Sequence, residues 1–270
     1  MAVLALHSGA SGLRAMSTNL DIIANNLANV NTPGYKSSRA NFQDLLYVER
    51  MQPGVENANG DQRPTGLYVG LGVKVSGTQL NFEEGAAIPS GRPLDVRIQG
   101  AGFFQVQVEE AKSADQIAYT RAGNFALNAD GELVLATDQG RRVVPSIQIP
   151  DDHIPPISIE SDGRVLVKTP GSTEPEEVGQ FELATFINPA GLEQVGENLY
   201  VETVASGGPI TGDPGEDSFG TLIAGSLEAS NVDPTRELID LIRTQRAFEM
   251  NSQSIQAADE SLQVVAQLGR

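Results

Sequence analysis

Cysteine is absent from the 270-residue chain, and so is tryptophan. Without cysteine the chain has no disulfide, no thiolate metal ligand and no thiol nucleophile. Its two histidines, His7 and His153, lie far apart in the sequence with no ligand-like spacing of carboxylates around them. The sequence therefore predicts neither a metal site nor a cofactor site, and each histidine is better explained as a surface or capping residue.

The sequence also lacks long hydrophobic runs. No stretch reaches the roughly 20 apolar residues that a bilayer span requires, and residues 1–12 have no basic leader. We therefore expect neither a cleaved signal peptide nor insertion into a membrane.

Positive charge is scarce in the middle of the chain. Residues 48–225 hold 26 of the 35 acidic residues but only 11 of the 18 basic ones. Because a strongly acidic surface repels phosphate groups, nucleic acid and anionic lipid are disfavoured as partners. The simplest reason for such a surface is solubility.

Catalytic patterns are missing as well. Acidic pairs such as Glu83–Glu84 and Asp151–Asp152 consist of neighbouring residues, which point in opposite directions on a strand. Gly100-Ala101-Gly102 leads into a predicted strand instead of the helix that a dinucleotide-binding loop requires. The sequence therefore predicts a protein that is not an enzyme.

Two hydrophobic ladders with seven-residue spacing lie at the ends of the chain. A helix with such a narrow apolar stripe must bury it against another helix, so the pattern predicts terminal helices that pair with each other or with neighbouring subunits. We call these residues the N-terminal seam (Leu6, Leu13, Met16, Leu20, Ile23 and Leu27) and the C-terminal seam (Leu241, Gln245, Phe248, Ile255 and Leu262). Polar residues such as Gln245 are either solvated or fix the register of a multi-helix contact, and we favour the second interpretation.

The helix boundaries have chemical signals. Pro33 and Gly34 fit the central positions of a type II turn, which predicts that the first helix runs from about Ala2 to Val30. Asp233 is a suitable N-cap and Pro234 a suitable first residue for a second helix that ends near Leu268. A short amphipathic segment is expected at 42–48, followed by an extended loop at 52–66.

The apolar pattern changes to a period of two between Leu67 and about Ala205. Asp130-Gly131 and Asp162-Gly163, each between two alternating runs, predict two β-hairpins. The fold class is therefore α+β: terminal helices pairing in a coiled-coil-like bundle, with a central antiparallel barrel-like or sandwich-like domain. The predicted divisions are an N-terminal helix at 1–35, a connecting region at 36–80, a β-domain at 81–220 and a C-terminal helix with its lead-in at 221–270. Residues 206–220 are expected to be a linker.

The run from Ala24 to Lys36 closely resembles the N-terminal signature of bacterial flagellar rod and hook axial proteins. Its motif residues here are Asn25, Asn26, Asn29, Asn31, Pro33, Gly34 and Tyr35. The stretches 227–233 and 245–251 resemble the signature at the other end of that family, and 92–95, 100–104, 119–125 and 196–200 resemble its β-domain. Residues 109–116 depart from the family, because they replace a tight turn with a longer charged segment.

Within this family, residues 47–72 are similar to a segment that the distal rod has and the hook lacks. The resemblance implies a structural subunit that assembles with copies of itself into a rigid hollow tube. Such a tube transmits torque and conducts exported subunits. The implied partners are proximal rod proteins, the hook protein, the basal-body rings and the flagellar type III export apparatus, which would deliver the chain to a rod crossing the periplasm. A proximal rod or hook subunit is the alternative within the family, and a secreted coiled-coil adhesin is the alternative outside it.

Overall fold

The computed structural model describes residues 2–54, 64–109, 113, 116–170, 174–216 and 218–268. The chain divides into two compact units, which are described separately. The first unit comprises residues 1–28, 38–80 and 233–270, and the second comprises residues 29–37 and 81–232. The terminal helices thus belong to one unit and most strands to the other.

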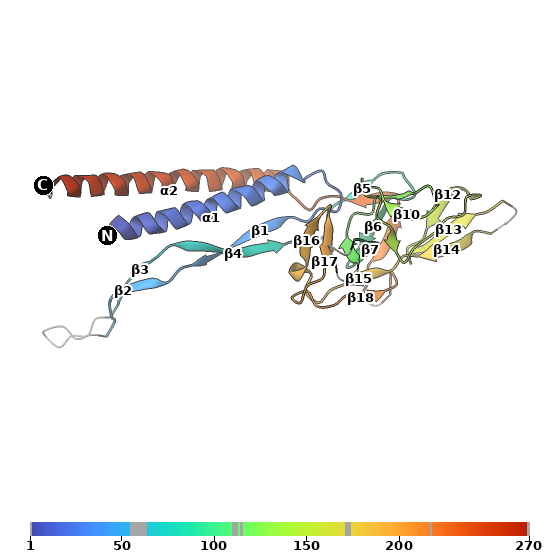
Figure 1. Cartoon of the computed structure of the whole chain (residues 1–270), viewed down its shortest axis with the longest axis horizontal. Coiled ribbons are helices and arrows are strands. Elements are labelled where there is room, and N and C mark those ends of the chain that lie inside the picture. Colours follow the sequence, from blue (N-terminus) through green and yellow to red (C-terminus); the bar gives the residue numbers. More distant parts are fainter. Residues whose placement is uncertain are drawn as a thin grey trace. The chain divides into compact units, whose positions relative to one another are not determined.

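The first unit contains both helices and a long two-part hairpin (Figure 1). Helix α1 spans Ala2–Ala28 and helix α2 spans Pro234–Leu268. Strand β1 (Ser38–Asp44) pairs with β4 (Val73–Leu80), and β2 (Tyr47–Met51) pairs with β3 (Leu67–Gly70), both antiparallel. Where the sequence suggested an amphipathic segment at 42–48, the chain is therefore mostly β-strand. Most of the predicted loop, residues 55–63, lies outside the described residues.

The start of α2 follows the predicted chemistry. The Asp233 carboxylate accepts hydrogen bonds from the backbone N–H groups of Thr235 at 2.9 Å and Arg236 at 3.3 Å, and Pro234 is the first helical residue. Asp233 thus satisfies donors that the first turn leaves free, which confirms the predicted cap.

The second unit is built from antiparallel strands. Its main sheet has the order β16-β17-β8-β7-β15-β18, with β11 also pairing with β7. A three-stranded sheet, β12-β13-β14, and the pairs β9–β10, β6–β19 and β5–β20 complete the unit. The strands are β5 (Ala87–Pro89), β6 (Val96–Gln99), β7 (Phe103–Gln107), β8 (Ile117–Thr120), β9 (Phe125–Leu127), β10 (Leu133–Leu135), β11 (Val143–Val144), β12 (Ile154–Ile159), β13 (Arg164–Lys168), β14 (Glu176–Gln180), β15 (Leu183–Thr185), β16 (Glu193–Gly196), β17 (Leu199–Val201), β18 (Ile210–Gly212), β19 (Thr221–Ala224) and β20 (Ser226–Glu228), with a short 3-10 helix at Pro189–Gly191.

Aromatic rings form the centre of this unit's core. Phe104, Phe125 and Phe181 are fully buried, and the ring centroids of Phe104 and Phe125 lie 5.1 Å apart at an edge-to-face angle of 90°. Apolar side chains from several sheets, including Ile98 and Leu133, surround them. One core therefore ties the small sheets to the main sheet.

The α+β class is confirmed, and so are both predicted hairpins, β9–β10 and β12–β13. The barrel form of the prediction is wrong, because the sheets traced through the described residues are open. The expected linker at 206–220 is also wrong in part, since β18 pairs with β15. Residues 221–232, which the sequence analysis grouped with the C-terminal helix, contribute β19 and β20 to the second unit.

Candidate assembly surfaces

Small residues bring the two helices of the first unit close together. Gly9 and Gly12 are buried, and a Cβ atom added to Gly9 would lie only 2.8 Å from Ile255 Cγ1. A Cβ added to Gly12 would lie 3.1 Å from Asn251 Nδ2. A larger side chain at Gly9 would force the Ile255 side chain to move, so glycine favours the close approach of α1 and α2 here.

Polar contacts fix the antiparallel register of this pair. The Asn19 amide donates to Thr244 Oγ1 at 3.0 Å, and the Asn26 amide donates to Glu237 Oε1 at 3.2 Å. Asn26 is 2% exposed, and burial raises the pKa of the Glu237 carboxyl. A one-residue slip of either helix would separate these partners, so the contacts specify a single alignment.

Asn26 also joins α1 to the hairpin. Its side-chain amide donates to the Ser38 carbonyl at 2.8 Å, and its side-chain oxygen accepts from the Ser38 N–H at 3.0 Å. The side chain of this motif asparagine thus pairs with both backbone groups of Ser38, as a neighbouring strand would do at the start of β1. Its two neighbours in the family motif, Asn25 and Asn31, are exposed.

The predicted seam residues are only partly covered within one chain. In α1, Ile23 is buried, whereas Leu6, Leu13, Met16, Leu20 and Leu27 are half-buried. In α2, Leu241, Ile255 and Leu262 are half-buried, and Gln245 and Phe248 are exposed. The structure thus turns part of each seam toward the other helix and leaves apolar surface uncovered.

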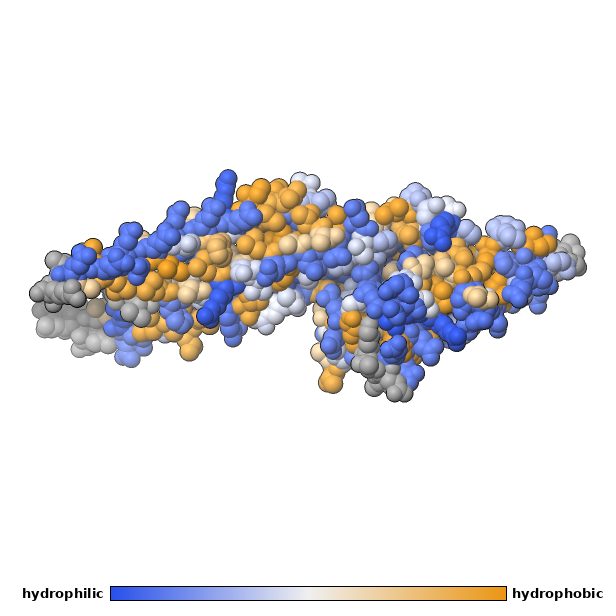
Figure 2. All heavy atoms as spheres, turned by 45° about the horizontal axis from the view of Figure 1, so that its top comes forward, coloured by the Kyte–Doolittle hydropathy of each residue, from blue (hydrophilic) through white to orange (hydrophobic). Residues whose placement is uncertain are grey.

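Sequence reasoning missed an exposed apolar group at the start of α2. Leu238, Ile239 and Ile242 are each nearly half exposed, although they lie beside the predicted seam. Their one- and three-residue spacing places them on a second face of the same helix, outside the seven-residue repeat of the C-terminal seam. Hydrophobic surface runs along the helical part of the molecule (Figure 2). Such surface is typical of a chain that buries it against another protein.

The hairpin of the first unit is also rich in exposed apolar side chains. Leu46 is 81% exposed and Tyr47 is 58% exposed, and β3 exposes Leu67 and Tyr68 by about half. A two-stranded ribbon has no core of its own, so these residues stay in water unless another surface covers them.

The family turn has the predicted geometry in the second unit. Gly34 has a φ of 72°, and the Tyr35 N–H donates to the Thr32 carbonyl at 3.2 Å. A Cβ on Gly34 would lie 2.6 Å from the Ala122 backbone nitrogen, so both the turn and the close approach require glycine. Pro33 accepts a hydrogen bond from Asn198, Tyr35 is buried, and Asn29 accepts one from Thr32.

A buried charge cluster joins three of the segments that carry the resemblance. Lys36 Nζ lies 2.6 Å from Glu228 Oε1 and 2.6 Å from the Glu83 carbonyl, and Arg121 Nη1 lies 3.6 Å from Glu228 Oε2. The side chains of Lys36, Glu228 and Arg121 are 0%, 1% and 5% exposed. Burial lowers the pKa of the Lys36 ammonium, although Glu228 opposes the shift. Two cations thus share one carboxylate, and the cluster connects three segments of the second unit that are distant in the sequence.

Asn231 makes a second connection from the C-terminal signature. Its side-chain oxygen accepts the Ser37 N–H at 2.8 Å, and its amide donates to the carbonyls of Asn81 and Glu83. No sequence pattern signalled the partners of Asn231 or of the charge cluster, because each set combines residues that are distant along the chain.

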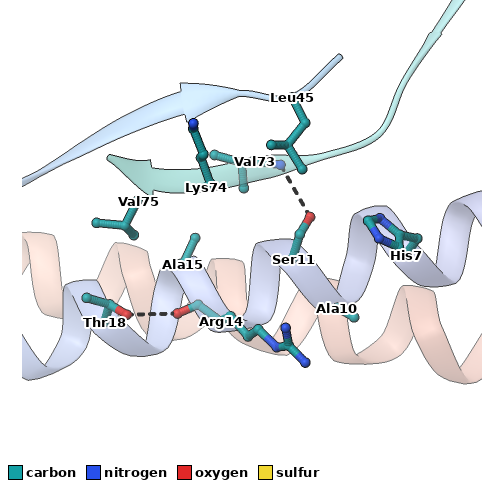
Figure 3. Close-up of a pocket in the computed structure, with 10 residues that line it drawn as sticks. All are labelled: His7, Ala10, Ser11, Arg14, Ala15, Thr18, Leu45, Val73, Lys74 and Val75. Atoms are coloured by element: carbon teal, nitrogen blue, oxygen red, sulfur yellow. Dashed lines mark hydrogen bonds between the residues drawn. The ribbon is translucent and has the colours of Figure 1, made fainter. Parts of the chain in front are cut away.

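A groove lies between α1 and the hairpin of the first unit (Figure 3). Its volume is about 430 Å³, and its lining residues are His7, Ala10, Ser11, Arg14, Ala15, Thr18, Leu45, Val73, Lys74 and Val75. The lining contains cationic and apolar side chains but no carboxylate. Within the described ranges, no cluster of His, Asp or Glu side chains could hold a metal ion, and no helix is both long and apolar enough to cross a membrane.

Comparison with known proteins identifies three family regions in this chain. Residues 6–36 match the model "Flagella basal body rod protein", residues 97–167 match "Flagellar hook protein FlgE/F/G D1 domain", and residues 223–268 match "Flagellar basal body rod FlgEFG protein C-terminal". The matched ranges include most of α1, all of α2 and the charge cluster.

Full-length relatives give the same result. Proteins named flagellar basal-body rod protein FlgG are 44% identical in Caulobacter vibrioides, 43% in Borreliella burgdorferi and 39% in Bacillus subtilis. Each comparison covers 98% of this chain and 98% of the relative. The likeness therefore extends through both units.

Proposed function

The chain belongs to the flagellar rod and hook protein family, and on this basis we propose that it is a subunit of the distal rod of the flagellar basal body. The family is structural and not enzymatic. The observation that carries the proposal is the identity of 43–44% over 98% of both chains to proteins named basal-body rod protein.

The subunit assembles with copies of itself into a hollow helical tube. Support comes from the first unit, where α2 leaves Leu238, Ile239 and Phe248 exposed and the seam of α1 is half-buried. Contacts that repeat from copy to copy without closing generate a helical tube. In that tube the terminal helices pair in a coiled-coil-like bundle that buries both seams. The tube transmits torque from the motor to the hook and conducts exported subunits.

The neighbours of the subunit follow from its place in the rod. We assign it contacts with proximal rod proteins on one side, with the hook protein on the other, and with the surrounding basal-body rings. Delivery is by the flagellar type III export apparatus. The absence of disulfides supports this route, because a chain without them can pass unfolded through a narrow channel.

The segment 47–72 distinguishes a distal rod subunit from a hook subunit. Its described part includes the β2–β3 ribbon, whose exposed Tyr47, Leu67 and Tyr68 provide surface for bridging a neighbouring subunit. The bridge prevents copies from sliding past each other and keeps the tube straight. Deletion of residues 52–65 should leave the β-rich unit as stable as before but give a tube that bends. Straight tubes of normal stiffness would contradict the distal assignment.

Imaging of basal bodies tests the proposal directly. Negative-stain electron microscopy of basal bodies from a strain that lacks this protein should show the proximal rod without its distal continuation and without a hook. Expression of the intact chain in the same strain should restore both. A full-length rod with a hook in the deletion strain would refute the proposed function.

A further inference from the structure

Cationic side chains border the apolar groove between α1 and the β1–β4 hairpin. Arg14 and Lys74 are exposed, whereas Val73 and Val75 are half-buried against α1. Val73 and Val75 face the helix because alternate strand residues share a side, and Lys74 points away from it (Figure 3). An occupant of the groove must therefore present apolar side chains flanked by carboxylates.

The groove is built into the fold of the first unit. Ser11 Oγ accepts the Val73 N–H at 3.2 Å, Ser8 Oγ donates to the Gly70 carbonyl at 3.3 Å, and a ring nitrogen of His7 lies 3.1 Å from the Leu71 carbonyl oxygen. These bonds connect the turn between the two strand pairs to the first half of α1. They hold the hairpin along the helix and leave the groove open.

The second half of α2 has the complementary composition. Met250, Ala257 and Val264 repeat every seven residues, and all three are exposed, Met250 by 63% and Val264 by 55%. Residues 247–268 include three exposed carboxylates, Glu249, Asp259 and Glu260, and no lysine or arginine.

Met250, Ala257 and Val264 do not lie on the face of α2 that contacts α1. Asn251 and Ile255 provide that face, opposite Gly12 and Gly9. At 100° per residue, the line through Met250, Ala257 and Val264 lies roughly 120° around the helix from it. We call this line the outer strip of α2. It is free to meet a second molecule.

We propose that the outer strip of α2 in one copy docks into the groove between α1 and the hairpin of a second copy. This inference rests on the proposed function, because it names a contact by which rod subunits assemble. Apolar side chains of the strip cover Val73 and Val75, while Glu249 and Glu260, which flank the strip along one side of α2, lie toward Arg14 and Lys74. The contact joins two different surfaces, so it repeats without closing and is compatible with an open tube.

Cross-linking in assembled rods tests the contact, because the natural chain has no cysteine to give a background. A Val75→Cys/Ala257→Cys variant, treated with a short bismaleimide in isolated basal bodies, should give a ladder of covalent oligomers. Each single variant should give none, and Val75→Cys/Val204→Cys should give none, since Val204 is a fully exposed residue of the second unit. Only cross-linked monomer, or no product, would overturn the proposal.

A mixture of purified chains keeps the test valid if the double variant does not build rods. Full-length Val75→Cys and Ala257→Cys chains, mixed at high concentration, should form heterodimers that mass spectrometry identifies by one cross-link between the two positions. Heterodimers cannot arise from a contact within one chain. A yield no higher than that of Val204→Cys mixed with Val75→Cys would overturn the proposal.

Charge reversal separates a specific contact from random collision. Arg14→Glu/Lys74→Glu in the groove chain should lower the heterodimer yield about fivefold, and Glu249→Lys/Glu260→Lys in the strip chain should do the same. Combining both reversals should restore the yield to within about twofold. The matched control Arg92→Glu/Lys168→Glu alters exposed residues of the second unit and should have no effect. If reversal of both sides does not restore the yield, the pairing is wrong.

The two proposals fail in different ways. A deletion strain that still builds distal rods refutes the proposed function. Rods that require this protein but show no cross-link between groove and strip refute only the docking contact.

Discussion

Replacing Glu228 by glutamine should destabilise the second unit more than any other single change in the charge cluster. Glu228 Oε1 accepts from Lys36 at 2.6 Å and from the Gly85 N–H at 2.9 Å, and Oε2 faces Arg121 at 3.6 Å. Glutamine has nearly the same shape but no charge. The variant therefore leaves two cations in a buried site with only the partly exposed Glu84 as a weaker counter-ion, which costs about 3–5 kcal/mol.

The change Lys36→Met should cost less, although it also breaks a buried ion pair. Arg121 remains to balance Glu228, so the cluster becomes neutral. The Glu83 carbonyl loses Lys36 but keeps the Asn231 amide at 3.1 Å. The loss is then mainly that of hydrogen bonds, about 1–3 kcal/mol. The structure thus predicts an order of the two variants as well as a magnitude.

Hydrogen exchange of the full-length chain measures the effect in the unit concerned. Amides of β7 and β8 report opening of the main sheet, and their exchange rates convert to a free energy of opening. Glu193→Gln, at an exposed position, is the matched control and should change this free energy by less than about 0.5 kcal/mol. The reasoning is refuted if Glu228→Gln costs no more than Lys36→Met, or if both cost less than about 1 kcal/mol.

Three further predictions concern the first unit. Phe248→Glu should leave the isolated chain stable because Phe248 is already 37% exposed, whereas Leu20→Glu should destabilise it moderately, and both should prevent rod assembly when observed by electron microscopy. Burial raises the pKa of Glu237 above its unfolded value of 4.5, so the stability it contributes is present below pH 4.5 and is lost as the pH rises through the folded-state pKa. We therefore expect Glu237→Gln to stabilise the helix pair relative to wild type, and this gain should be larger at neutral pH than at pH 4.5. Amide exchange of the two helices measures it. Gly72→Ala should destabilise the hairpin contact by about 1–3 kcal/mol, because Gly72 has a φ of 115° and its Cβ would collide with Ser11 Oγ.

Each of these predictions has a control and a contrary result. Ser254→Glu, at an exposed polar position of α2, is the control for Phe248→Glu and should assemble normally. Normal rods from both seam variants would show that the seams are not buried in the tube. An equal pH response of wild type and Glu237→Gln would exclude Glu237 as the source. Gly77→Ala, where a Cβ meets no atom within 4 Å, is the control for Gly72→Ala, and equal effects would contradict the close contact with Ser11.

Local signals in the sequence predicted much of the fold. The proline–glycine turn after α1, the Asp233 cap and the two Asp-Gly hairpins each depend on residues within a few positions of one another. Backbone conformation at such sites is decided by side chains that are adjacent in the sequence. The linker prediction for 206–220 was wrong in part. Gly, Pro and Asp residues there indicate the turns around β18, but they do not indicate that β18 pairs with β15.

The charge cluster could not be predicted, because its three members come from positions 36, 121 and 228. Each looks like an ordinary surface charge in its own segment. Only the pairing of β20 with β5, and the path of the chain after the Gly34 turn, bring them together. The resemblance to known proteins marked all three segments, yet it did not show that they meet.

The family motif contains residues that are buried in the fold and residues that are exposed. Asn26, Gly34 and Tyr35 are buried, and their bonds are satisfied within one chain, so a change there acts first on stability. Asn25 and Asn31 are exposed. A polar residue at an exposed position adds little to the stability of a single chain. We infer that Asn31 is used between subunits. We therefore expect the first unit to combine a fixed antiparallel register, set by Asn26 and Asn19, with an outer surface that is covered only in the assembled rod.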